Sequence, residues 1–287
     1  MAKIYVINLK KNVLRRNYIT RLLKRYKINY DFVIVDQITN EIYETYVQNK
    51  SITKSEFGCL ISHLWCLNDI IKNQYKNAII FEDDIIFHKQ FIPLFKKIYN
   101  PTHDLLILGA CDFSFSNYNY KNVNNGLYTI DSNSKKVYGA HANYYSLKGA
   151  EKMFNLKTTS EVSFFDKDYL QMFDFFNESA FICYPNLVVS DISTSNLEHI
   201  YSFGSVAEKN YYKKCFIDFA FQDYHFIYLD IIEKNKNIAI RDDDTYETYW
   251  KRIIYNYFHN ELLTKEITDR MSFELFTIKD VIYMITH

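Results

Sequence analysis

Hydrophobic residues recur along the first 110 residues both in short runs and in longer stretches with helical spacing. The short runs predict strands at residues 3–9, 30–36, 78–87 and 104–108. The helical spacing predicts helices at residues 13–26, 55–72 and 91–98, the second of them capped by Thr53 or Ser55. Because strands alternate with helices, we expect an α/β fold with a mainly parallel sheet covered on both faces. A ligand site is expected beyond the carboxyl ends of its strands.

The later part of the chain has a less regular pattern. Residues 127–130 and 136–145 are apolar segments on either side of a polar stretch, which predicts a β-hairpin, and a short helix is expected at 148–156. From about residue 200 the chain is rich in aromatic residues and mostly helical in pattern, with no Gly/Pro-rich linker before it. We therefore predict a main domain at residues 1–199 and a mainly helical C-terminal extension at residues 200–287 packed on it.

Three consecutive carboxylates, Glu82, Asp83 and Asp84, interrupt the apolar run at residues 78–87, which contains no Lys or Arg. An ionised carboxylate in apolar surroundings must be paired, protonated or bound to a metal. On a strand, Glu82 and Asp84 would point to one face and Asp83 to the other, so that two carboxylates could hold Mg²⁺ or Mn²⁺. The alternative is a set of acids that ends a strand at the surface. Apolar residues follow at 85–87, which favours the metal site.

Composition narrows the class of protein. With 48% hydrophobic and 24% charged residues among 287, the chain is typical of a globular protein. Its 34 basic and 34 acidic residues balance, so nothing indicates a nucleic-acid partner. The first 30 residues, however, hold nine Lys or Arg and no acid, which favours a local anion site. Five scattered cysteines without a C-x-x-C pair indicate neither a disulfide framework nor a structural zinc site.

The chain offers no apolar core of signal-peptide length at its start and no segment long enough to span a bilayer. We therefore expect a cytoplasmic protein in a reducing compartment. Its heavy use of Ile, Lys, Asn, Tyr and Phe indicates an AT-rich source, viral or bacterial.

Several short motifs occur in a fixed order between residue 3 and about residue 197. They are Ile-Tyr-Val-Ile-Asn-Leu-Lys at 4–10 with Arg15 and Arg16 after it, Val-Asp at 35–36, Glu-Phe-Gly-Cys-Leu-Ile-Ser-His at 56–63, Ile-Ile-Phe-Glu-Asp-Asp at 79–84, Tyr-Gly-Ala-His at 138–141, Lys-Gly-Ala at 148–150, Pro-Asn-Leu-Val at 185–188 and Ser-Asn-Leu at 195–197. In this order they resemble glycosyltransferase family 25, which includes bacterial lipooligosaccharide galactosyltransferases and collagen galactosyltransferase domains.

The resemblance implies a GT-A type, Rossmann-like mixed sheet flanked by helices. It also implies a UDP-sugar donor and an inverting transfer that depends on Mn²⁺ or Mg²⁺. The sugar would be a hexose, galactose or glucose, and the acceptor a hydroxyl group on a glycan or a protein. In the family's acidic motif Asp84 looks like the metal ligand, joined by Glu82 and by His141, while Glu82 or Asp83 would face the nucleotide sugar.

The nucleotide-binding candidates come from the ends of the first two predicted strands and from one helix. Asn8, Arg15 and Arg16 follow the first strand, where basic side chains and a helix N-terminus suit a phosphate. Asp36 closes the second strand, where a nucleoside contact and a plain turn carboxylate are equally good interpretations. His63 matches the family motif, although a lone histidine in a helix is commonly a core residue.

An inverting transfer needs a base for the acceptor hydroxyl, and the candidates are Asp166 and Asp168, between which the sequence does not choose. A second acidic run, Asp242 to Asp244, is explained more simply as the cap of a following helix.

Two other functions stay open. One is a catalytically silent relative that binds or scaffolds, and the other is a phosphoryl or nucleotidyl transferase, which the lack of a P-loop disfavours. For the extension at 200–287 the open roles are acceptor recognition and self-association into a homo-oligomer.

Overall fold

A computed structural model describes residues 2–47, 51–88, 90–110, 120–124, 126–130, 137–183 and 186–190. All of them lie in one compact unit that spans residues 1–198. The predicted extension at 200–287, including Asp242 to Asp244, lies outside the described residues. Within the described ranges, every helix is too short or too polar to cross a lipid bilayer.

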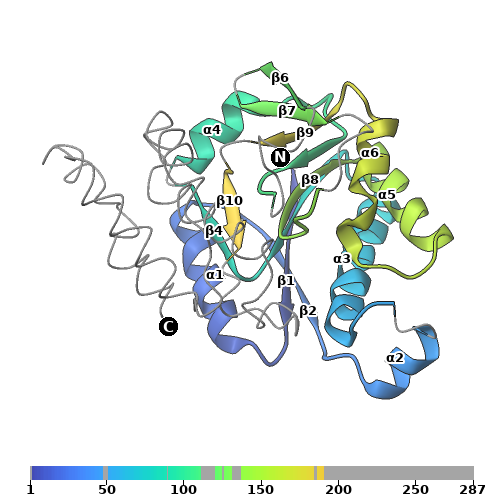
Figure 1. Ribbon diagram of the computed structural model, residues 1–287. Coiled ribbons are helices and arrows are strands. Elements are labelled where there is room, and N and C mark those ends of the chain that lie inside the picture. Colours follow the sequence, from blue (N-terminus) through green and yellow to red (C-terminus); the bar gives the residue numbers. More distant parts are fainter. Residues whose placement is uncertain are drawn as a thin grey trace, which may run out of the picture. The chain divides into compact units, whose positions relative to one another are not determined.

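An eight-stranded mixed sheet forms the centre of the described unit (Figure 1). Its strand order is β2-β1-β3-β8-β5-β9-β7-β6. The strands are β1 (Lys3–Leu9), β2 (Asp31–Val35), β3 (Asn77–Glu82), β5 (Leu105–Ile107), β6 (Tyr120–Asn124), β7 (Leu127–Ile130), β8 (Ala142–Ser146) and β9 (Ala180–Cys183). Two further strands, β4 (Ile85–Phe87) and β10 (Val188–Ser190), pair with each other in an antiparallel ribbon.

Helices cover both faces of this sheet (Figure 1). Helices α1 (Val13–Arg25) and α4 (Phe91–Ile98) lie on one side, and α3 (Lys54–Lys72), α5 (Leu147–Thr159) and α6 (Tyr169–Phe175) on the other. A short α2 (Asn40–Tyr46) precedes α3, and a 3-10 turn, η1 (Phe165–Asp168), precedes α6. The predicted α/β architecture is therefore confirmed for the described unit.

Helix α3 begins where its sequence predicts. The Thr53 side chain accepts a hydrogen bond from the Glu56 backbone N–H at 3.2 Å, and the Glu56 carboxylate accepts one from the Thr53 N–H at 2.6 Å. This reciprocal capping box satisfies two backbone donors that a helix start leaves free. Glu56 thus has a structural role, and Thr53 rather than Ser55 is the cap.

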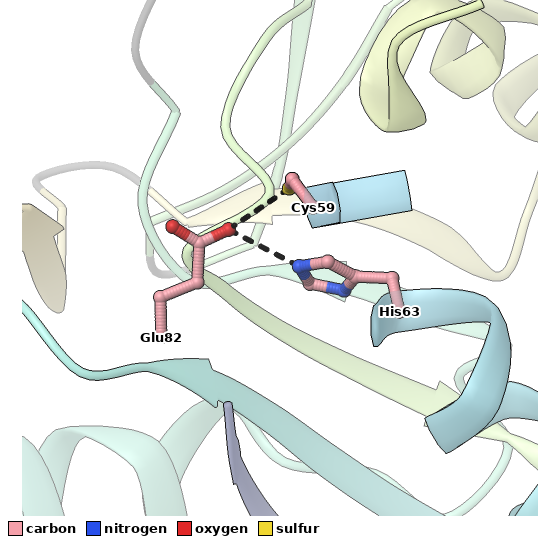
Figure 2. A group of neighbouring side chains, drawn as sticks. All are labelled: Cys59, His63 and Glu82. Carbon is pink, nitrogen blue, oxygen red and sulfur yellow. Dashed lines mark hydrogen bonds and ion pairs between the residues drawn. The ribbon is translucent and has the colours of Figure 1, made fainter. Parts of the chain in front are cut away.

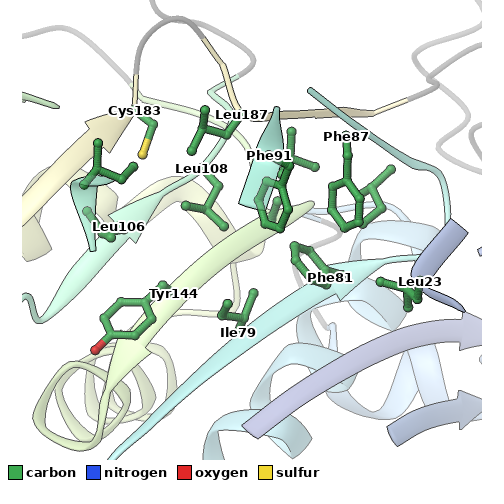
Figure 3. Packing of buried hydrophobic residues seen from close by; sticks show 14 of the residues in the cluster. Leu23, Ile79, Phe81, Phe87, Phe91, Leu106, Leu108, Tyr144, Cys183 and Leu187 are labelled. Atoms are coloured by element: carbon green, nitrogen blue, oxygen red, sulfur yellow. The ribbon is translucent and has the colours of Figure 1, made fainter. Parts of the chain in front are cut away.

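A buried apolar cluster lies between the sheet and the side of α1 and α4 (Figure 3). Ile79 and Phe81 of β3 point into it, and the Phe87 ring of β4 stacks on Phe91 of α4 with centroids 4.3 Å apart. On the other face Tyr5 of β1 packs edge-on against Trp65 of α3. Because side chains alternate along a strand, both faces of β1 and β3 are buried, as in sheets covered on both sides.

Three sequence-based expectations about the strands are wrong. Residues 78–87 do not form one strand, because β3 ends at Glu82 and a turn at Asp83 and Asp84 leads into β4, which belongs to the separate ribbon. Residues 127–130 pair with β6 and β9 and not with 136–145, which supply β8 between β3 and β5. The sheet is also not mainly parallel, since four of its seven pairings are antiparallel.

Candidate active site

The acidic turn after β3 lies beside the end of β1. Ile7 stands opposite Glu82 in the parallel pair of strands, which brings Asn8 next to Asp83. The Asn8 Nδ2 donates a hydrogen bond to Asp83 Oδ2 at 2.5 Å, and Arg15 Nη1 contacts Asp83 Oδ1 at 2.9 Å. Arg15 Nη2 lies 3.3 Å from Asp84 Oδ2. Four of the predicted residues are therefore brought together by two strand ends and the first turn of α1.

Burial sets the electrostatics of this turn. The side chains of Asp83 and Asp84 are both only 7% exposed. Burial raises the pKa of the Asp83 carboxyl, although the charge of Arg15 and the hydrogen bonds from Asn8 and Arg15 act in the opposite direction. Arg15 therefore places a positive charge against both buried carboxylates of the turn.

Arg16 and Asp36 have different surroundings. Arg16 Nε donates to Asn8 Oδ1 at 2.7 Å, and its Nη2 donates to the Lys10 carbonyl at 2.7 Å, so Arg16 holds the segment between β1 and α1. It is more than a solvated residue on a basic helix face. Asp36 instead forms an exposed pair with Lys10 at 3.3 Å. Such exposed pairs contribute little to stability.

Glu82 faces α3, where it meets Cys59 and His63 (Figure 2). The Glu82 Oε1 lies 3.1 Å from His63 Nε2 and 3.6 Å from Cys59 Sγ. Burial would raise the pKa of the Glu82 carboxyl, but the His63 hydrogen bond and the charges of His63 and His141 outweigh it and lower that pKa. Burial and the carboxylates of Glu82 and Asp166 raise the pKa of the Cys59 thiol. His63 is therefore a fully buried histidine with a carboxylate partner at the candidate site.

His141 stands at the start of β8, next to Glu82. Its backbone carbonyl accepts a hydrogen bond from the Glu82 N–H at 2.9 Å. Its Nε2 lies 3.3 Å from the Val188 carbonyl oxygen of β10. A Cβ atom on Gly109 would come within 1.7 Å of that same oxygen, so a glycine is required for β10 to approach this closely.

The two candidate bases on η1 have opposite surroundings. Asp166 Oδ2 accepts a hydrogen bond from the Gly139 N–H at 2.7 Å. Burial raises the pKa of Asp166 to about 6, the charge of Glu82 adds to this rise, and the Gly139 hydrogen bond opposes it. Asp168 is instead paired with Lys157, whose Nζ lies 2.7 Å away, and the two side chains are 6% and 1% exposed.

The Lys157 ammonium group also ties down the chain before η1. It donates to the Phe164 carbonyl at 2.7 Å and to Ser163 Oγ at 3.0 Å. Burial lowers the pKa of Lys157, while its bond to Asp168 acts in the opposite direction. The charge of Asp168 is therefore paired with that of Lys157 within the fold, and Asp166 is the acid that lies near Glu82.

Comparison with protein families identifies the family of this chain. The model of glycosyltransferase family 25 (LPS biosynthesis protein) matches residues 1–170. The chain belongs to glycosyltransferase family 25. The resemblance read from the sequence motifs is confirmed, and the protein is a transferase that moves a sugar from a donor to an acceptor.

Solved structures show a distant similarity to this family 25 chain. One is a glycosyltransferase involved in the glycosylation of the major capsid of PBCV-1, at 9% identity and a TM-score of 0.41, which covers 73% of this chain and 98% of that one. Another is 4-diphosphocytidyl-2C-methyl-D-erythritol synthase from Anaerococcus prevotii DSM 20548, at 15% identity and a TM-score of 0.31, with 70% and 77% covered. No curated protein matches the sequence.

Sequence reasoning missed two residues at the site of this glycosyltransferase. Cys59 lies four positions before His63 on α3, and this helical spacing could have shown that the two share a face. Lys157 gave no signal, because its carboxylate partner, Asp168, lies across a loop that only the fold closes.

Proposed function

We propose that this family 25 enzyme is an inverting GT-A type glycosyltransferase that moves a hexose, galactose or glucose, from a UDP-sugar to a hydroxyl group on a glycan or a protein. One observation carries the proposal. Asp166, with a pKa of about 6, lies near Glu82 at the carboxyl end of β3, beside the acidic turn that Arg15 and Asn8 hold. Ligands of α/β proteins bind at such strand ends.

The side-chain types in and beside this turn suit a hard divalent cation. Mn²⁺ and Mg²⁺ prefer carboxylate oxygens, and Mn²⁺ also accepts an imidazole. Asp84, Glu82 and His141 would supply these ligands, and the Asp84 side chain is only 7% exposed. When bound, such an ion would neutralise the charge that develops on the leaving diphosphate.

The protein's own residues would handle the acceptor and the donor. Asp166 takes the proton of the acceptor hydroxyl while the acceptor oxygen bonds to the anomeric carbon of the sugar. The bond from that carbon to the diphosphate oxygen breaks, and its electron pair leaves with UDP. A base with a pKa near 6 is ionised at neutral pH and can still accept a proton. Arg15 and Arg16 supply positive charge near the diphosphate.

Asp168 is the weaker candidate for the base. Its carboxylate is buried against Lys157 and is almost closed to solvent. A base must come within hydrogen-bond reach of the acceptor hydroxyl, or reach it through one water. Asp166 meets this condition better because its side chain is partly exposed and the charge of Glu82 acts on it.

The test is release of UDP from UDP-galactose and UDP-glucose by the purified chain with Mn²⁺. Asp166→Asn should lower turnover by about 10²- to 10⁴-fold, the usual contribution of a general base. Asp31→Asn is the matched control, because Asp31 pairs with Lys3 at the opposite end of β1 and should leave turnover unchanged. Absence of UDP release with either donor, even with acceptor present, would refute the proposal and favour a silent binding protein.

A further inference from the structure

We propose that Cys59, His63 and Glu82 form a second cation site, one that binds a thiophilic divalent ion of the Zn²⁺ type. The proposed function uses Glu82 for Mn²⁺ but gives no role to the thiol or to its position opposite that carboxylate. Cys, His and carboxylate side chains are the three classes of zinc ligand in proteins.

The backbone brings the three ligand atoms together before any ion binds. Cys59 and His63 are four residues apart on α3 and so share one helix face, and Glu82 ends the neighbouring strand β3 (Figure 2). The ligand atoms all lie within 4.8 Å of one another. The site therefore needs no rearrangement of secondary structure.

The two separations from the Glu82 oxygen are close to those of a tetrahedral zinc centre. Bonds of about 2.3 Å to sulfur and about 2.1 Å to nitrogen and oxygen would place S and O about 3.6 Å apart and N and O about 3.4 Å apart. The observed distances to Glu82 Oε1 are 3.6 Å from Cys59 Sγ and 3.1 Å from His63 Nε2. Three protein ligands would leave a fourth position for water.

An ion can reach the site from solvent. The Glu82 side chain is 27% exposed, whereas His63 is fully buried behind it. The neighbouring carboxylates Asp84 and Asp166 act electrostatically on Cys59, so the surroundings are anionic. A site with sulfur, nitrogen and oxygen donors prefers Zn²⁺ to Mn²⁺ by the usual order of stabilities.

One feature limits the affinity. The Nδ1 atom of His63 is buried and has no hydrogen-bond partner among the described residues. Coordination through Nε2 would put the ring proton on this atom, where it would have no acceptor, and this weakens binding. We therefore expect zinc to bind reversibly, more weakly than at a structural zinc site.

The consequence for the enzyme would be inhibition by zinc. The ion would displace the Cys59 thiol proton into solvent and occupy the carboxylate of Glu82, which the Mn²⁺ site also needs. This consequence rests on the proposed function, whereas zinc binding itself does not.

The test uses Co²⁺ as a spectroscopic probe on the purified full chain. Cobalt bound to a thiolate gives a charge-transfer absorption that cobalt bound to oxygen lacks. We expect this absorption in the wild type and in Cys66→Ala, and its loss in Cys59→Ala. Cys66 is the matched control because it is a buried thiol two turns further along α3. Zn²⁺ should displace the cobalt and remove the band.

A second variant keeps the test independent of one substitution. Glu82→Gln retains the size of the side chain and should weaken cobalt binding at least about tenfold. Replacing a residue that only supports a metal ligand already lowers metal affinity by about this factor. Circular dichroism checks that each variant is folded. No thiolate band in the wild type, or an equal band in Cys59→Ala, would overturn the proposal. A Cys59-dependent band in a chain without glycosyltransferase turnover would support the zinc site and refute only the proposed function.

Discussion

Replacing Asp166 by Asn should make the protein more stable at neutral pH. Burial raises the pKa of Asp166 from 3.8 to about 6 in the folded state. The folded state thus binds this proton more tightly than the unfolded chain. The contribution of Asp166 to stability is therefore fully present below pH 3.8 and is lost as the pH rises through 6. This difference in pKa is worth about 3 kcal/mol, and the ionised carboxylate destabilises the wild type by that amount at pH 8.

Asn removes the charge and can still accept the hydrogen bond from the Gly139 N–H. Urea unfolding at pH 8 should therefore show the Asp166→Asn variant to be about 3 kcal/mol more stable than the wild type. At pH 5 the gain should fall to about half, because the wild-type carboxyl is then largely protonated. An equal gain at both pH values, or a loss at pH 8, would refute the reasoning.

Asp168→Asn is the matched control, two residues away on the same turn. It would leave the ammonium group of Lys157, which is 1% exposed, without its carboxylate. Removing one partner of a buried ion pair costs about 3–5 kcal/mol. The two substitutions should therefore change stability in opposite directions at pH 8, and a shared direction would contradict the different surroundings assigned to the two acids.

Three further predictions concern turnover and packing. The kcat/KM for UDP-sugar should fall about tenfold per pH unit below about pH 6, as Asp166 becomes protonated, and a flat profile from pH 5 to 8 would exclude it as the base. Chelation should stop UDP release, and added Mn²⁺ should restore it. The Asp84→Ala variant should lose turnover with little change in Tm, and full activity of this variant would reject Asp84 as a metal ligand. Gly149→Ala should lower the free energy of unfolding by about 1–3 kcal/mol or more, because its Cβ would lie 2.0 Å from the Asp104 backbone oxygen. Gly58→Ala, whose Cβ would meet only a flexible isoleucine side chain at 3.3 Å, should be nearly neutral, and equal losses in thermal melts of the two variants would contradict this packing argument.

The sequence predicted local elements well where one pattern dominated. Residues 3–9, 13–26 and 91–98 appear as β1, α1 and α4 within a residue of their predicted ends. The start of α3 was predicted within one residue, with Thr53 as one of two candidate caps, because a cap contacts residues only a few positions away. Such features depend on contacts between residues close together in the sequence, so they can be predicted from the sequence.

Pairing between distant segments could not be read in the same way. The run at 78–87 is apolar almost throughout, and its turn exists because β4 leaves the sheet to pair with β10, about 100 residues later. Residues 127–130 have a strand pattern that fits several partners, and only the packed sheet selects β6 and β9. The pattern of a strand predicts which face of the sheet each side chain lies on, but it does not predict which strand lies next to it.

The amino-acid order alone determined the family, the α/β class and the acidic run around which the candidate site is built, since these depend on residue types and on short spacings. The tertiary structure decided which atoms meet. It joined Glu82 to Cys59 and His63, Arg15 to both Asp83 and Asp84, and Asp168 to Lys157. The physical reason is that charge, burial and coordination depend on distances in space, and residues far apart in the chain acquire such distances only when the sheet and its helices pack.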